Sequence, residues 1–296
     1  MHVEQAYAKI NLYLDVESRR ANGYHNIVSI MQTVSLQDTI RVEFTPTAST
    51  EIILTAPGNH AMPLDQRNLA WRAADRFLRH TNQTGRVEIS IEKQIPMAAG
   101  LAGGSADAAA VFRALNSLCT SRLSTEELCA LGSGLGADIP FCIVGGSALV
   151  TGIGEVMEPA PALPPCYLVV ACMGEGVSTV WAYGELDERY QNFTATSGND
   201  PRPQRILEHF RGQRIAEACP LFYNIFEDVV CEVNPYVEKE KSLMEQAGAI
   251  AAMMSGSGPS VFGIFEKETE AEQACAALKD MGARAFVCQP TKKYSL

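Results

Sequence analysis

The sequence of 296 residues lacks any stretch of about 18 consecutive apolar residues, and it therefore predicts no transmembrane helix. It also begins without the apolar region that is typical of a secretory signal peptide. Basic residues are fewer than acidic ones: the chain has 24 Lys and Arg and 34 Asp and Glu, which gives a net charge of −10. This balance argues against binding to duplex nucleic acid by broad phosphate neutralisation. We therefore expect a cytoplasmic protein that binds neither membranes nor nucleic acid.

Disulfide and metal-binding cysteine patterns are also missing. The nine cysteines form no C-x-x-C pair, have irregular spacing and lie mostly in apolar runs, so we expect reduced, buried thiols. The composition does provide 47% hydrophobic residues, enough for a substantial core. The chain length favours two domains. Prolines cluster between residues 159 and 165 and predict a boundary there, giving domains 1–158 and 159–296.

The hydrophobic pattern predicts strands and helices in both halves. In the first half we expect strands at 6–16, 27–36, 39–44 and 87–92, and helices at 68–79, 108–118 and 125–131. In the second half, helices at 178–190, 204–218, 224–246 and 269–281 alternate with strands at 167–172, 249–254, 261–265 and 284–288. We expect a polar loop at residues 192–203, between two of these helices. Such interleaving favours an α/β sandwich of the ferredoxin-like kind.

A glycine-rich turn at Pro96–Ala110 directly precedes an apolar helix. Gly100, Gly103 and Gly104 let the backbone bring its N–H groups close to a ligand, and Ser105 or Asp107 can cap the helix that begins at Ala108. A helix N-terminus of this kind favours an anion such as phosphate. The alternative is a tight strand-to-helix connection without a ligand.

Two other glycine loops are excluded by their residues. The Walker pattern requires a lysine after its last glycine, whereas Gly104 is followed by Ser105 and Ala106. The spacing of Gly100, Gly103 and Gly104 also does not match the dinucleotide-binding pattern Gly-x-Gly-x-x-Gly.

Three separated segments together resemble the motifs of the GHMP kinase superfamily, and they are Ala8–Asn11, Pro96–Ala110 and Met254–Val261. Four further segments are similar to the 4-diphosphocytidyl-2-C-methyl-D-erythritol kinase family, namely Arg20–His25, Gly136–Phe141, Gly152–Glu155 and Val177–Thr179. The resemblance spans nearly the whole chain. It implies an α+β, two-domain fold with an N-terminal S5-like domain and a C-terminal ferredoxin-like sandwich. It also implies transfer of the γ-phosphoryl group of ATP, with Mg²⁺, to the 2-hydroxyl of a cytidine-diphosphate sugar alcohol.

The resemblance assigns catalysis to Lys9 and Asp138. Asp138 lies between glycines and a proline, in a turn that suits a carboxylate acting as base toward the acceptor hydroxyl. Lys9 occupies an otherwise apolar strand, where an ammonium group is costly unless it is paired, and Asp138 is the expected partner. The alternatives are a capping aspartate and a lysine that reaches solvent from a strand edge.

The resemblance also assigns binding residues. ATP is expected to contact Asn68, Lys93, Pro96, Met97, Ala98, Ala99, Gly100, Leu101, Ala102, Gly103, Gly104, Ser105 and Ala106. The cytidine-diphosphate substrate is expected to contact Asn11, Tyr24, His25, Tyr183, Ser255, Gly256, Ser257 and Gly258. Lys93 is equally consistent with a solvated charge at a strand end, and Tyr183 with core packing. No residue set predicts a protein-held metal site, and no pattern predicts an oligomeric state.

The chain departs from the family pattern at Ala102, where glycine is usual, and at Ala106, where serine is usual. We expect Ala102 to be tolerated only with φ below zero. Another GHMP small-molecule kinase, of the homoserine or mevalonate type, and a non-catalytic ligand-sensing module of the same fold remain the alternative functions.

Overall fold

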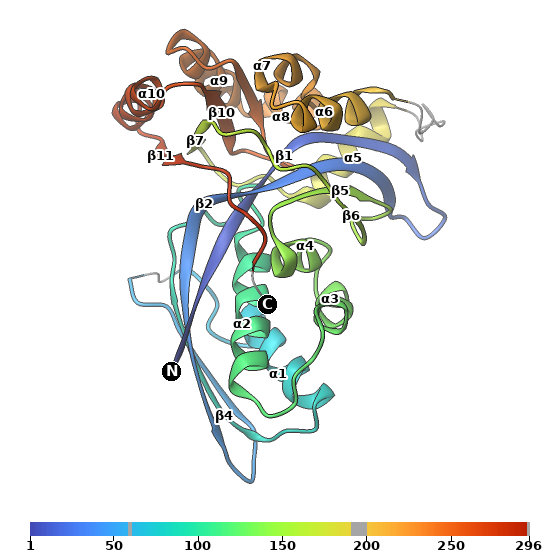
Figure 1. Cartoon of the computed structure of the whole chain (residues 1–296), viewed down its shortest axis with the longest axis vertical. Helices are drawn as coiled ribbons and strands as arrows, with labels where there is room; N and C mark the ends of the chain where they lie inside the picture. Colours follow the sequence, from blue (N-terminus) through green and yellow to red (C-terminus); the bar gives the residue numbers. More distant parts are fainter. Residues whose placement is uncertain (59–60, 191–199, 295–296) are drawn as a thin grey trace.

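The computed structural model describes residues 1–58, 61–190 and 200–294. Two long strands, β1 (His2–Arg19) and β2 (His25–Pro46), pair in antiparallel fashion and run between the two halves of the molecule (Figure 1). The two strands predicted at 27–36 and 39–44 are therefore wrong as separate elements. They form one strand because no glycine or proline interrupts the chain between them, and β-branched or apolar residues continue through it.

The N-terminal sheet has seven strands in the described part of the chain, with the order β3-β4-β2-β1-β8 and with β5 and β6 as a hairpin on β2. Its other strands are β3 (Glu51–Thr55), β4 (Gly85–Glu92), β5 (Ser147–Thr151), β6 (Val156–Pro159) and β8 (Tyr223–Asn224). Sequence analysis did not predict β3, which pairs in parallel with β4. β8 comes from the C-terminal half and pairs with β1, so both halves of the chain contribute to this sheet.

Helices α1 (Leu69–His80), α2 (Gly103–Leu118), α3 (Thr125–Ser133) and α4 (Ile139–Val144) accompany the N-terminal sheet. The alanine-rich α2 is buried against β1, β2 and α1, where side chains such as Phe77 and Phe112 are fully buried. α3 begins with a complete capping box between Ser124 and Glu127. α4 was not predicted, because its six residues read as an apolar run; Pro140 lies in its first turn, where proline favours a helix start.

The second sheet has the strand order β11-β7-β10-β9, and all its pairs are antiparallel. The strands are β7 (Tyr167–Cys172), β9 (Ala251–Met254), β10 (Val261–Phe265) and β11 (Arg284–Cys288), with α9 (Pro235–Gln246) and α10 (Glu268–Asp280) packed on them. In chain order this is 4-1-3-2, the order of a ferredoxin-like sandwich. The predicted fold class is confirmed.

The remaining helices of the C-terminal half are α5 (Thr179–Arg189), α6 (Arg202–Arg211), α7 (Ile215–Ala218) and α8 (Glu227–Val233), with a 3-10 turn at Cys219–Leu221. The helix predicted at 204–218 is divided near Gly212, and the one predicted at 224–246 is divided at Asn234, which caps α9 ahead of Pro235. Most of the loop predicted at 192–203 lies outside the described residues. Within the described residues, no helix has the length and apolarity needed to cross a bilayer.

Candidate active site

Nearly all the residues singled out in the sequence line one cavity of about 1150 Å³. The wall includes Lys9, Asn11, Tyr24, His25, Asn68, Lys93, residues 96–100, residues 102–105, Asp138, Tyr183, Gly256 and Ser257. Leu101, Ala106, Ser255 and Gly258 lie behind this wall. The tertiary structure thus brings together segments from both halves of the chain.

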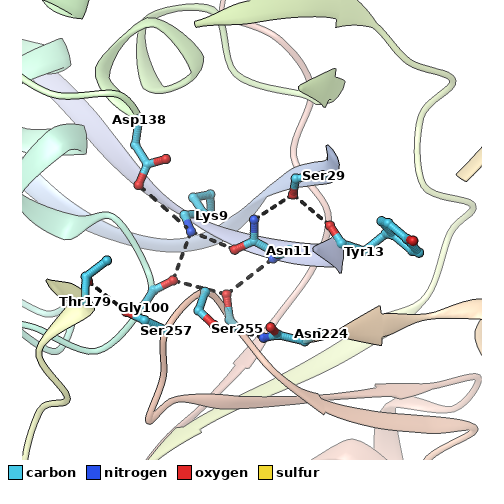
Figure 2. Close-up of polar contacts among 11 residues, drawn as sticks. Lys9, Asn11, Tyr13, Ser29, Gly100, Asp138, Thr179, Asn224, Ser255 and Ser257 are labelled. Atoms are coloured by element: carbon cyan, nitrogen blue, oxygen red, sulfur yellow. Dashed lines mark hydrogen bonds and ion pairs between the residues drawn. The ribbon is translucent and has the colours of Figure 1, made fainter. Parts of the chain in front are cut away.

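Lys9 lines this cavity from β1, its side chain is almost completely buried, and Figure 2 shows its polar contacts. Its Nζ donates hydrogen bonds to Asn11 Oδ1 at 2.7 Å and to the Gly100 carbonyl at 3.1 Å. Asn11 is itself held by Ser29, whose Oγ accepts a hydrogen bond from Asn11 Nδ2 at 2.8 Å. These bonds compensate the burial of the ammonium group, so the alternative of a lysine reaching solvent is wrong.

Asp138 faces Lys9 from the start of α4. Its Oδ2 lies 4.0 Å from Lys9 Nζ, and a third of its side chain is exposed. Asp138 is the N-cap residue of α4 by position, but its side chain makes no capping hydrogen bond. The carboxylate is therefore available to the cavity, next to a cation, and the prediction that Lys9 and Asp138 are neighbours is confirmed by their distance.

The glycine loop closes over the other side of Lys9, and its backbone departs from one expectation. Ala102 has φ = 56°, in the left-handed region, as does Ala98 at 51°. The expectation that Ala102 needs φ below zero is therefore wrong. A left-handed alanine is strained because its Cβ crowds the backbone, and the surrounding contacts of the loop must impose it.

The helix after this loop also begins earlier than predicted. α2 starts at Gly103 rather than Ala108, and its N-cap residue Ala102 has no side chain that can accept a hydrogen bond. Neither Ser105 nor Asp107 caps it, since both lie inside the helix. The N–H groups of the first turn consequently remain directed at the end of the loop, as an anion site requires.

A second loop, at Ser255–Gly258, packs directly on the glycine loop. Ser255 Oγ donates a hydrogen bond to the Gly100 carbonyl at 3.1 Å and accepts one from the Asn11 backbone N–H at 3.3 Å. Asn224 Nδ2 donates to the carbonyls of Met254 and Gly256 at 2.8 and 2.9 Å. Figure 2 shows the two contacts of Ser255, with Gly100 and with Asn11, beside Lys9. Sequence analysis missed Asn224, which has no local signal because its partners are about 30 residues away.

Three aromatic side chains, those of Tyr24, His25 and Tyr183, also line the cavity. The His25 ring stacks on the Tyr183 ring with centroids 4.7 Å apart, and His25 Nε2 lies 2.8 Å from Asp187 Oδ1. Tyr24 is 60% exposed. Asp187 was not predicted, although it lies one helical turn after Tyr183 on α5, a spacing that places both on one face.

Lys93 and Asn68 line the same cavity beside the glycine loop. Lys93 is buried and paired with two carboxylates, Asp38 and Asp107, so the alternative of a solvated strand-end charge is wrong. Asn68 caps α1 by accepting a hydrogen bond from the Ala70 N–H at 2.9 Å. Asp38 was not predicted, because a single acid in a strand gives no sign of its partners.

Comparison with known proteins identifies the family of the chain. The GHMP kinases N terminal domain family matches residues 68–146, and the GHMP kinases C terminal family matches residues 206–284. A 4-diphosphocytidyl-2-C-methyl-D-erythritol kinase from Gloeobacter violaceus is 42% identical over 96% of this chain and 93% of its own length. The chain belongs to the 4-diphosphocytidyl-2-C-methyl-D-erythritol kinase family. A relative of the same name from Exiguobacterium sibiricum is 41% identical over 96% of both chains.

Solved structures support the same family. A crystal structure of 4-(cytidine 5'-diphospho)-2C-methyl-D-erythritol kinase is 34% identical, with a TM-score of 0.80, and covers 98% of this chain and 99% of that one. A mevalonate kinase from L. major shares the fold at a TM-score of 0.72, with 18% identity and coverage of 100% and 97%. As a member of the 4-diphosphocytidyl-2-C-methyl-D-erythritol kinase family, the protein is an ATP-dependent small-molecule kinase.

Proposed function

We propose that the protein transfers the γ-phosphoryl group of ATP to the 2-hydroxyl of 4-diphosphocytidyl-2-C-methyl-D-erythritol. The observation that carries this proposal is the position of the Lys9–Asp138 pair in the shared cavity. The glycine loop contacts Lys9 through the Gly100 carbonyl, and the stacked His25 and Tyr183 rings line the same cavity. A phosphoryl donor held by the loop and a cytosine-bearing acceptor held by the rings would then meet at the Asp138 carboxylate.

ATP is proposed to occupy the side of the glycine loop. Backbone N–H groups of residues 96–106 and the N-terminus of α2 would hold its phosphates, because a helix start carries unpaired donors and partial positive charge. Asn68 and Lys93 border this side of the cavity and are proposed to shape the nucleoside end.

The cytidine-diphosphate substrate is proposed to occupy the other side. Tyr24 would stack on the cytosine, and His25, held in place by Asp187 and Tyr183, would bind its edge. Stacking of a base on an aromatic ring contributes about 1–3 kcal/mol. Asn11 and residues 255–258 are proposed to contact or support the diphosphate and the sugar alcohol.

Asp138 is proposed to orient the acceptor hydroxyl and to accept its proton as the oxygen attacks the γ-phosphorus. Lys9 would balance the negative charge that develops on the transferred group. The transfer is proposed to be direct and in line, because the three superfamily motifs contain no cysteine or histidine to carry a phosphoryl intermediate.

Magnesium is proposed to enter with ATP. Mg²⁺ binds phosphate oxygens, water and one or two carboxylates, and it neutralises phosphate charge. The described residues contain no group of three or more His, Cys, Asp or Glu side chains that could hold a metal on their own. The cavity therefore fits an ion held chiefly by the nucleotide.

The cytoplasm is the proposed location, which the nine free cysteines support, and no nucleic-acid or membrane partner is proposed.

The choice of acceptor separates this function from that of a homoserine or mevalonate kinase. We expect ADP release with 4-diphosphocytidyl-2-C-methyl-D-erythritol, and none above background with homoserine or mevalonate, in a coupled assay. Equal rates with mevalonate would contradict the substrate assignment, and no turnover with any acceptor would favour a ligand-sensing module.

Replacing Asp138 tests the mechanism. We expect Asp138→Asn to lower kcat by about 10²–10⁴-fold, because the amide keeps the shape but cannot accept the proton. The Kd for ADP should change by less than about threefold, measured by calorimetry, since the glycine loop is intact. Asp280→Asn, an exposed change at the end of α10, is the control. A near-normal kcat for Asp138→Asn would show that the base is elsewhere.

A further inference from the structure

We propose that Asp38, Lys93 and Asp107 form a buried ionic cluster that positions the glycine loop for ATP, so that they act as positioning residues. The proposal rests on the nucleotide site proposed above. In this proposal Lys93 acts on ATP binding by holding the glycine loop in position. Asp38 and Asp107, to which the sequence motifs assigned no such role, act with it.

The cluster joins three elements behind the loop. Lys93 follows β4, and its Nζ donates hydrogen bonds to Asp38 Oδ2, on β2, at 2.5 Å and to Asp107 Oδ2, on α2, at 2.8 Å. The three side chains are 5%, 0% and 2% exposed, in the order Lys93, Asp38 and Asp107. An ion pair at this depth is weakly screened and has a defined geometry.

The bonds of the cluster reach both ends of the loop. Asp38 Oδ1 accepts hydrogen bonds from the backbone N–H groups of Gln94, at 2.5 Å, and Ile95, at 2.9 Å, immediately before Pro96. Asp107 lies four residues after Gly103, in the first turns of α2. The cluster thus fixes where the loop leaves the sheet and where it enters the helix.

Lys93 also touches the loop itself. A Cβ placed on Gly103 would lie 3.0 Å from Lys93 Nζ, so the ammonium group packs against the glycine at the start of α2. Movement of Lys93 would therefore change the place where the first N–H groups of the helix are presented.

Fold stability alone does not account for this arrangement. Two carboxylates share one ammonium group, and burial together with the Asp38 charge raises the pKa of Asp107 to about 7. Asp107 Oδ1 has no hydrogen-bond partner in the described part of the chain. Apolar residues of similar volume often stabilise a core at least as well as a buried ion pair does, whereas the pair specifies a geometry.

The test separates loop position from general stability. We expect Lys93→Met to raise KM for ATP and Kd for ADP by about tenfold or more, while KM for the cytidine-diphosphate substrate changes by less than twofold. Lys93→Arg, which keeps the charge and the donors, should recover most of the ADP affinity. Lys279→Met, on the exposed face of α10, is the matched control and should match the wild type.

Asp107→Asn keeps the proposal testable if Lys93→Met does not fold, because the amide has nearly the shape of the carboxyl group but no charge with which to hold the Lys93 ammonium group. We expect the same selective loss of ADP affinity. Folded variants with wild-type Kd for ADP, or with equal increases in KM for both substrates, would overturn the positioning role. A wild-type protein that does not bind ADP would instead overturn the proposed function.

Discussion

At the scale of single residues, Ala102 places a strained backbone conformation in the glycine loop. Its left-handed φ of 56° costs an alanine roughly 1–2 kcal/mol, whereas glycine adopts this conformation freely. Glycine also loses more entropy on folding, by roughly 0.5–1 kcal/mol, so we expect Ala102→Gly to stabilise the fold by up to about 1 kcal/mol. Denaturant unfolding measures this change.

The control for that substitution should change the free energy of unfolding in the opposite direction. Ala276→Gly, at an exposed position within α10, should destabilise the protein by about 1 kcal/mol, because glycine is a poor helix former. If Ala102→Gly destabilised the fold as much as Ala276→Gly, the left-handed conformation of Ala102 would carry no strain.

At the scale of elements, helix α9 carries a buried acid that makes stability depend on pH. Glu240 is fully buried, its two oxygens have no hydrogen-bond partner among the described residues, and burial raises its pKa to about 8. The unfolded chain releases this proton near pH 4.5, the ordinary value, so stability falls as the pH rises from there to about 8.

We therefore expect Glu240→Gln to be more stable than the wild type at pH 8, by up to about 5 kcal/mol (about 1.4 kcal/mol per pH unit between the two pKa values), with the difference shrinking toward pH 5. Thermal unfolding at several pH values measures it. Glu245→Gln, an exposed change on the same helix, should show no such trend. A pH-independent difference for Glu240→Gln would mean that Glu240 is ionised in the folded protein.

At the scale of the whole molecule, the cavity depends on the contact between the glycine loop and the Ser255–Gly258 loop. A Cβ on Gly100, where φ is +76°, would lie 2.1 Å from the Ser255 carbonyl oxygen. We expect Gly100→Ala to separate the two loops and to lower kcat/KM for ATP by about 10²-fold or more, because small misplacements of reacting groups cost this much. Steady-state kinetics measures the loss.

Gly282→Ala is the matched control for this change. Gly282 has a similarly left-handed φ of +96°, but its Cβ would have only Met173 Cε nearby, at an ordinary 3.6 Å. We expect it to lower the melting temperature while kcat/KM stays near the wild-type value. If both variants lost activity equally, backbone strain rather than loop contact would be responsible.

Much of the molecule could be predicted from local patterns. The alternation at 87–92 identified β4, the capping box identified the start of α3, and the order of the strands and helices after residue 167 predicted the ferredoxin-like half. Local signals failed where packing decides the outcome. β3 and α4 depend on neighbours that a window of sequence does not contain.

The sequence by itself determined which chemical groups the protein has, and in what order: a lysine in an apolar strand, a glycine loop before a helix, and an acid in a turn. These are local, since turn geometry and helix initiation depend on adjacent residues. The tertiary structure alone decided that Lys93 is enclosed by Asp38 and Asp107, 55 and 14 residues away, and that Ser255 holds the Gly100 carbonyl. Such contacts join distant segments, and only burial in a common core makes them energetically necessary.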